Sequence, residues 1–402
     1  MSRRLKDETL CLIGGYEKES QLRHQSFTPP LYQTVTYPLP SGEKAHAFFD
    51  GNDPYTQFIY TRRHNPTTDF LEKRLTLLEE ADGTLCSSSG MGAIHLVNTF
   101  FLDKSELECV WSNRIYSRSY EIFARALPAY GIRCHMITDP VNLDQWEAKL
   151  TKGVKLAFLE SPTNPGLLVL DIRKIAEICR ARGIHLVVDN TLASPVATKP
   201  IALGADVSIE STSKYISGNG SLLGGSASMA DRRWIEAMRR SNNINYGASP
   251  APFNSWLCLM GLETLGLRMA QHTENALAVA KFLAGHPKVA QVNYPGLAEH
   301  PQHELARIQM NEIYGGLMSF CLKDQSWDKV FAFLNALELV VLAVHESASR
   351  SIVTHPASTN FFNMSKEELQ EAGVPPGLIR LSVGLEHIDD ILTDLEEALA
   401  KA

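Results

Sequence analysis

Short apolar strands alternate with amphipathic helices between about residues 69 and 230, and this alternation constrains the fold more than any other feature of the chain. The segments KLAFLE (155–160), IHLVVD (184–189) and ADVSIE (205–210) are short and apolar, as buried strands are. Between the first two, residues 171–183 predict a helix with Asp171 as its N-cap and Gly183 after its end. Strands separated by helices form parallel βαβ units, so we expect an α/β fold whose loops gather at the carboxyl ends of the strands.

The chain on either side of this region has a different pattern. Residues 1–60 are rich in Pro, Tyr, Thr and Gly without periodicity, which predicts an extended arm lying on a neighbouring subunit. A predicted helix begins at about residue 69 and stops at Gly83. After about residue 256, long helical segments and strand-like pieces predict a smaller α+β domain. We therefore expect an arm (1–60), a large domain (61–255) and a C-terminal domain (256–402).

Charge and cysteine content argue against several classes of protein. The net charge of -7 and the pI near 6.0 disfavour a nucleic-acid-binding protein. The seven cysteines are scattered, odd in number and never in a CxxC pair, so neither a disulfide framework nor a metal site is indicated. Since no apolar run is long enough for a signal peptide or a membrane span, we expect a soluble, cytoplasmic protein without membrane partners.

Polar residues follow three predicted strands, and a parallel sheet brings these strand ends together. Asn164 follows the first strand, Asp189 closes the second, and Lys214 lies beyond the third in STSK (211–214). A buried aspartate is costly without a cation, and a protonated pyridine nitrogen would serve Asp189. Two ordinary interpretations stay open at this point: Asp189 caps a turn or pairs with an arginine, and Lys214 is a solvated loop residue.

A short turn of small residues, Ser87 to Gly90, leads into an apolar helix and could hold a phosphate on unpaired backbone amides. Taken alone, such a turn is more often structural. Neither GxxxxGK[ST] nor GxGxxG occurs in the chain, which argues against a P-loop and against a nicotinamide-dependent oxidoreductase. A non-catalytic binding protein on the same scaffold stays open, because fold does not decide function.

Several motifs occur in order along the chain: YTRRHNPT (60–67), SPTNP (161–165), VVDNT (187–191) and STSKYISG (211–218). With them the sequence resembles the pyridoxal-phosphate-dependent Cys/Met metabolism family, from about residue 10 to the C-terminus. That family includes methionine gamma-lyases, cystathionine gamma-lyases, cystathionine gamma-synthases and O-acylhomoserine sulfhydrylases. The resemblance implies an aminotransferase-like large domain with a mostly parallel sheet, pyridoxal 5'-phosphate (PLP) as cofactor, and a homotetramer whose dimers share active sites.

The resemblance also implies residue roles. Lys214 would bond to the cofactor aldehyde and carry protons, and Asp189 would hold the ring nitrogen. Tyr116 would stack on the ring and assist the leaving group, although the sequence alone favours a core tyrosine. Arg380 would clamp the substrate carboxylate, its alternative being a surface salt bridge. The other implied residues are Ser89, Gly90, Met91, Asn164, Thr191, Ser211 and Ser213 at the cofactor, Tyr60 and Arg62 from the neighbouring subunit, and Arg118 and Ser349 at the substrate.

The implied reaction is gamma-elimination from a sulfur amino acid such as methionine, homocysteine or cystathionine, giving a 2-oxo acid, ammonia and a thiol. The alternative is gamma-replacement, as in O-acylhomoserine sulfhydrylase or cystathionine gamma-synthase. Two stretches depart from the family pattern: residues 116–119 read YSRS, and residues 344–351 read VHESASRS. The second places His345, Glu346 and Arg350 where small or apolar residues are expected, while Val344 favours a methionine-like side chain.

Overall fold

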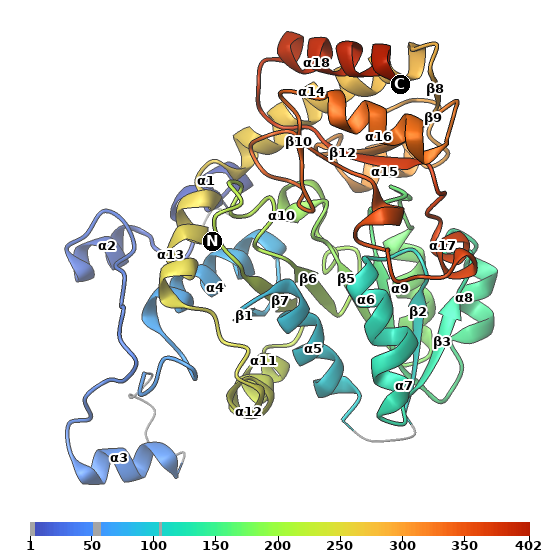
Figure 1. The fold of residues 1–402 in the computed structure, drawn as a ribbon. Helices are drawn as coiled ribbons and strands as arrows, with labels where there is room; N and C mark the ends of the chain where they lie inside the picture. Colours follow the sequence, from blue (N-terminus) through green and yellow to red (C-terminus); the bar gives the residue numbers. More distant parts are fainter. Residues whose placement is uncertain (1–4, 51–57, 104–106) are drawn as a thin grey trace.

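The structure is a computed structural model that describes residues 5–50, 58–103 and 107–402. Its strands form a seven-stranded sheet in the order β1-β7-β6-β5-β4-β2-β3 and a five-stranded sheet in the order β10-β11-β12-β9-β8 (Figure 1). The strands of the first sheet are β1 (Gly83–Ser87), β2 (Glu108–Ser112), β3 (Arg133–Ile137), β4 (Val154–Glu160), β5 (His185–Asp189), β6 (Val207–Glu210) and β7 (Gly225–Met229). Those of the second are β8 (Val289–Asn293), β9 (Leu317–Leu322), β10 (Val341–Leu342), β11 (Ile352–Thr354) and β12 (Leu378–Ser382). The predicted α/β class is confirmed.

The helices surround both sheets. From the N-terminus to residue 262 the α-helices are α1 (Asp7–Ile13), α2 (Lys18–His24), α3 (Gly42–Phe49), α4 (Pro66–Glu79), α5 (Gly90–Phe101), α6 (Ser117–Glu121), α7 (Leu127–Ala129), α8 (Leu143–Lys149), α9 (Ile172–Ala181), α10 (Ser194–Ala197), α11 (Arg232–Met238), α12 (Ile244–Tyr246) and α13 (Pro252–Leu262). The remaining ones are α14 (Leu265–Gly285), α15 (His303–Gln309), α16 (Trp327–Ala336), α17 (Lys366–Ala372) and α18 (Ile388–Lys401). Within the described ranges, none of these helices has the length and apolar character needed to cross a membrane.

The first sheet is covered on both faces, which explains its nearly continuous apolar strands. Along β5, Val187 belongs to the core cluster beneath α5, whereas Leu186 and Val188 belong to the cluster beneath α8 and α9. Neighbouring strands β4, β5 and β6 are parallel, as predicted, and only β7 runs antiparallel to its neighbours β1 and β6. The parallel strands therefore bring the loops after β4, β5 and β6 to one edge of the sheet.

The second sheet is packed against α14, α16 and α18, seen together at the top of Figure 1. On α18, Ile391, Leu395 and Leu399 are fully buried in this core, as the apolar spacing of the closing helix predicts. Residue 256, where the sequence pattern changes, lies inside α13, and α13 packs against α4 of the first domain through Leu259 and Leu262. The chain therefore enters the second domain through α14.

The predicted helix end at Gly83 was wrong. Helix α4 ends at Glu79, where Glu80 adopts a left-handed conformation with φ 55° and its amide caps the carbonyls of Thr76 and Leu77. Gly83 instead begins β1, where a Cβ atom would lie 3.0 Å from Ile235 Cγ1. Glycine at this position lets β1 pack closely against α11, a contact that the periodicity of the sequence does not predict.

The N-terminal region contains short helices that the sequence does not predict, although residues 27–40, with their prolines, are non-helical as expected. Helix α1 is held by Arg74 of α4, whose guanidinium donates to the carbonyl oxygens of Cys11 and Gly14 at 3.1 and 2.9 Å. The following extended segment is tied to the start of α4, because the Tyr32 amide donates to Thr67 Oγ1 at 2.8 Å. These helices are stabilised by tertiary contacts more than by local propensity.

Candidate active site

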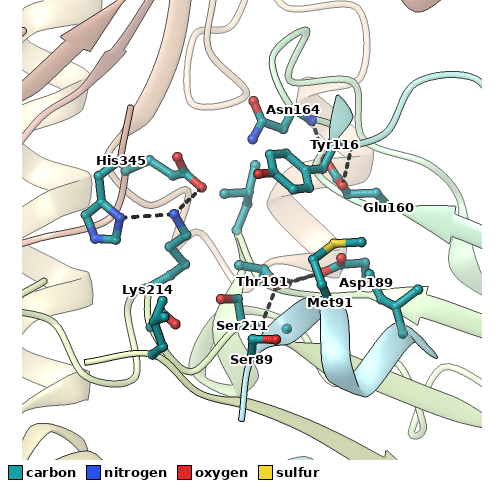
Figure 2. Close-up of a pocket in the computed structure, with 16 residues that line it drawn as sticks. Ser89, Met91, Tyr116, Glu160, Asn164, Asp189, Thr191, Ser211, Lys214 and His345 are labelled. Atoms are coloured by element: carbon teal, nitrogen blue, oxygen red, sulfur yellow. Dashed lines mark hydrogen bonds and ion pairs between the residues drawn. The ribbon is translucent and has the colours of Figure 1, made fainter. Parts of the chain in front are cut away.

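One cavity of about 210 Å³ opens where the carboxyl ends of β4, β5 and β6 meet the amino end of α5 (Figure 2). Ten of the predicted site residues line it: Ser89, Gly90, Met91, Tyr116, Asn164, Asp189, Thr191, Ser211, Ser213 and Lys214. The other lining residues are Ile94, Glu160, Leu192, Leu223, His345 and Glu346. The sequence-predicted convergence of three strand-end loops is therefore present in the structure.

Lys214 lies in the turn that follows β6 and points into the cavity. Its Nζ atom is 3.1 Å from His345 Nδ1 (Figure 2). The same atom is 2.8 Å from Oε1 of Glu346, which follows His345 on the loop after β10. Only 17% of its side chain is exposed, so it is not the solvated loop lysine of the ordinary interpretation. The next residue, Tyr215, is buried, and its hydroxyl accepts a hydrogen bond from the Gly316 amide at 2.6 Å, just before β9. The lysine turn is thus tied to the second sheet.

Asp189 ends β5 with its carboxyl group buried. One of its oxygens, Oδ1, accepts hydrogen bonds from the amide and the hydroxyl of Thr191 at 3.1 and 2.6 Å. Burial raises the pKa of this carboxyl above its usual value, and the Thr191 hydrogen bonds oppose that effect. The carboxylate therefore gains stability from a cationic ligand in the cavity, and no arginine fills that role among the described contacts of Asp189.

The amino end of α5 forms an anion-binding corner of the cavity. Ser89 caps the helix through Oγ, which accepts from the Gly92 amide at 3.0 Å. The amides of Gly90 and Met91 precede the first intrahelical hydrogen bonds and remain available to a ligand. A Cβ atom on Gly90 would lie 2.8 Å from Ser211 Cβ, so only glycine lets α5 come this close to the lysine turn. Ser213 supports the same turn, its hydroxyl accepting from the Gly224 amide at 3.0 Å.

Arg380 does not line the cavity; it lies directly behind it on β12, with 2% of its side chain exposed. Its NH1 group donates to Asn164 Oδ1 at 3.0 Å, and its NH2 group is 2.9 Å from Glu346 Oε2. The alternative of a surface salt bridge is therefore wrong, because both partners are buried. Tyr116 is half-buried over the same end of the cavity, its amide donating to Glu160 Oε2 at 2.9 Å.

Besides Arg380, four predicted site residues lie outside the cavity. Arg118 is exposed on α6, and Ser349 uses its amide to donate to the Gly218 carbonyl oxygen at 2.8 Å. Tyr60 and Arg62 are exposed before α4, with the Arg62 guanidinium carbon 5.5 Å from the centre of the Tyr60 ring. Their expected place in a neighbouring subunit's site stays a prediction.

Sequence reasoning missed Glu160 and gave no role to Glu346 or His345. A signal for Glu160 exists, since it ends a buried strand as Asp189 does, and its two oxygens accept from the Tyr116 and Asn164 amides. Burial, together with the charge of Asp189, raises the pKa of Glu160 well above its usual range. The loop that carries His345 and Glu346 has no periodic pattern that would place it here.

The residues of this cavity fit PLP. The cavity offers a partner for each functional group of this cofactor. An amine can bond to its aldehyde, a buried carboxylate favours a cationic ring nitrogen, and a helix terminus can bind its phosphate. The close approach at Gly90 builds the anion corner from two separate segments, α5 and the turn around Ser211. Lys214, Asp189 and the α5 amides are accordingly the groups that would hold the cofactor.

Comparison with known proteins decides the family. The model of the family described as Cys/Met metabolism PLP-dependent enzyme matches residues 8–400. This chain belongs to that family. L-methionine gamma-lyase of Pseudomonas putida is 36% identical over 395 residues, covering 97% of this chain and 96% of the relative. O-acetyl-L-homoserine sulfhydrylase of Leptospira meyeri is 34% identical, covering 99% of this chain and 98% of the relative.

A solved structure confirms the fold and shows the cofactor on a lysine. This Campylobacter jejuni protein, assigned as an O-acetylhomoserine (thiol)-lyase, carries N'-pyridoxyl-lysine-5'-monophosphate. It matches with a TM-score of 0.93 and 33% identity, covering 98% of this chain and 100% of that chain. The chain is therefore a PLP-dependent enzyme of the trans-sulfuration family of lyases and synthases, and the oxidoreductase and non-catalytic alternatives are set aside.

Proposed function

We propose that the protein is a PLP-dependent carbon–sulfur lyase that converts a methionine-like amino acid and water into a 2-oxo acid, ammonia and a thiol by gamma-elimination. The observation that carries this proposal is the convergence of Lys214, Asp189 and the amino end of α5 on one cavity. Its apolar lining by Ile94, Leu192 and Leu223 suits an uncharged thioether side chain. Similarity to methionine gamma-lyase supports the same activity.

When bound, PLP supplies an electron-withdrawing ring that stabilises negative charge at the substrate α carbon. Asp189 contributes a buried carboxylate that favours a positive charge on the ring nitrogen. Lys214 is the base that would remove the α proton and then a β proton of the substrate, so that the γ substituent can leave; its amine must be neutral each time it accepts a proton. His345 Nδ1, at 3.1 Å from Nζ, is close enough to accept a proton from this amine.

Tyr116 is the candidate acid for the departing sulfur. Burial raises the pKa of its phenol above the usual value, so it holds its proton at neutral pH. Asn164 lines the end of the cavity where the substrate carboxylate would be held, and Arg380 lies directly behind it, joined to Asn164 by a 3.0 Å hydrogen bond. Ser211 and Ser213 would contribute hydroxyl donors beside the anion corner of α5, and Thr191 would keep Asp189 oriented.

Gamma-replacement is the second candidate, supported by similarity to O-acetyl-L-homoserine sulfhydrylase over nearly the whole chain. The two reactions would share the roles of Lys214, Asp189 and Arg380; they differ in the leaving group, a thiol or an acyloxy group, and in whether water or a thiol completes the cycle. We further propose a cytoplasmic homotetramer in which Tyr60 and Arg62 reach a partner's phosphate. The exposed side chains of Phe27, Val35 and Tyr60 along the N-terminal region support an intersubunit contact there.

The test uses purified protein reconstituted with PLP. Visible absorbance of the lysine-bound cofactor is expected in the wild type and should disappear in Lys214→Ala. The protein is then incubated with methionine, homocysteine, cystathionine or O-acylhomoserines, with and without added thiol. A 2-oxo acid and a thiol formed without added thiol support the lyase. Thioether formed without oxo acid would establish gamma-replacement instead.

A further inference from the structure

The guanidinium of Arg380 is already engaged by a carboxylate of its own chain. NH2 is 2.9 Å from Glu346 Oε2 and donates to the His345 carbonyl oxygen at 3.2 Å, while NH1 donates to Asn164 Oδ1 at 3.0 Å. Both terminal nitrogens therefore have partners. A substrate carboxylate that takes the planar fork of Arg380 must displace one of them.

Glu346 is held firmly in this position. It is 5% exposed, and the following amide, that of Ser347, donates to Ser382 Oγ on β12 at 2.7 Å. Although burial acts to raise the pKa of Glu346, the charges of Arg380 and Lys214 lower it to about 2. At neutral pH the side chain is therefore a carboxylate, chemically the same group as the α-carboxylate of an amino-acid substrate.

The contact with Arg380 does not depend on Lys214. The two Glu346 oxygens have different partners, since Oε1 faces Lys214 Nζ at 2.8 Å and Oε2 faces Arg380 NH2 at 2.9 Å. When Lys214 is engaged elsewhere, Arg380 becomes the principal cationic partner of Glu346, and a buried carboxylate keeps such a partner strongly. The occupant of Arg380 thus persists in the working enzyme until a ligand replaces it.

We propose that Glu346 is a specificity-determining residue that competes internally with the substrate α-carboxylate for Arg380. This inference rests on the proposed function, in which Arg380 receives that carboxylate. The competition reduces the affinity gained from an α-carboxylate and favours ligands whose amine and side chain supply most of the binding. An apolar residue at position 346 would remove the competing carboxylate from Arg380.

The experiment compares two ligands of the PLP-loaded enzyme by isothermal titration calorimetry. Norleucine has an amine, a straight apolar side chain and an α-carboxylate, whereas pentylamine is the same molecule without the carboxylate. In the wild type we expect norleucine to bind less than about tenfold more tightly than pentylamine, a small gain for a charge-assisted contact. In Glu346→Gln and Glu346→Leu the ratio should rise by about tenfold or more, because norleucine tightens and pentylamine does not.

Glu386→Gln is the matched control. Glu386 holds the same loop by accepting from the Ser351 amide at 2.6 Å and the Ser351 hydroxyl at 2.9 Å, yet it has no recorded contact with Arg380 in the described structure. Its variant should leave the ratio of the two dissociation constants unchanged. An unchanged or lower ratio in both Glu346 variants, or an equal rise in Glu386→Gln, would overturn the proposal. Since binding needs no turnover, a rise in the ratio without lyase activity would refute only the proposed function.

Discussion

Glu160 and Asp189 stand opposite each other in register at the ends of β4 and β5, two buried carboxyl groups on neighbouring parallel strands. Burial, with the charge of Asp189, raises the pKa of Glu160 well above its usual range. Burial also raises the pKa of Asp189, although Thr191 stabilises its charged form. Such a pair is costly on its own and gains stability from a bound cation, which is what a protonated ring nitrogen supplies.

The Asp189→Asn variant should bind PLP more weakly. Its neutral amide cannot form a charge-assisted hydrogen bond with the ring nitrogen, so we expect the dissociation constant to rise by about 10- to 100-fold. Titration of the apo-protein with PLP, followed by absorbance, measures this change. Asp206→Asn is the control, because Asp206 accepts from the Leu186 amide at 2.9 Å at the opposite end of these strands. Equal PLP affinity in the two variants would contradict the assignment.

The Gly90→Ala variant should disturb the anion corner. The added methyl group would lie 2.8 Å from Ser211 Cβ, and this overpacking separates α5 from the lysine turn, costing about 1–3 kcal/mol. We expect PLP to bind at least about tenfold more weakly in the same titration. Gly42→Ala is a matched control, since Gly42 also begins a helix after a serine cap and a Cβ there meets no atom of the described residues within 4 Å. A Gly90→Ala protein with wild-type affinity would show that this corner does not hold the phosphate.

Glu79 of α4 and Glu210 of β6 are buried carboxyl groups whose pKa values burial raises, so the stability of the folded protein should depend on pH. Ser208 Oγ donates to Glu79 Oε1 at 3.1 Å, and burial raises the pKa of Glu79 from 4.5 to about 7. The folded protein favours the protonated acid, so this stabilisation is complete below pH 4.5 and is lost as the pH rises through 7. The loss is on the order of 3 kcal/mol.

Urea unfolding of the apo-protein at several pH values between 4.5 and 8 measures this effect. The Glu79→Gln variant should lose less stability over that interval than the wild type, because its side chain stays neutral. Glu299→Gln, an exposed substitution, should follow the wild type. Parallel curves for the wild type and Glu79→Gln would mean that folding does not raise the pKa of Glu79.

The part of the site that belongs to the parallel sheet could be predicted from the sequence. Strands β4, β5 and β6 are short apolar segments, and Asp171 caps the intervening helix by accepting from the Lys174 amide at 3.0 Å. Once those elements are recognised, the parallel arrangement places Asn164, Asp189 and Lys214 at one edge. Local pattern and fold topology were sufficient for these residues.

The other contributors depend on contacts that no local pattern records. Glu346 lies 132 positions after Lys214 in the chain. It comes within 2.8 Å of Lys214 because the loop between β10 and β11, held by the pairing of β10, β11 and β12, lies at the cavity. Glu80 ends α4 with a left-handed conformation that glycine or asparagine would usually supply. Tertiary contacts set both the end of α4 and the position of Glu346. Sequence reasoning therefore found Arg380 but not its partner Glu346.

The hydrogen bond between the Tyr215 hydroxyl and the Gly316 amide has a mechanical consequence for the reactive amine next to it. Through this bond the lysine turn is anchored in the seven-stranded layer and braced by the five-stranded one. The position of the Lys214 Nζ atom therefore depends on the packing of both hydrophobic cores, and neither core alone could fix the geometry of the reaction.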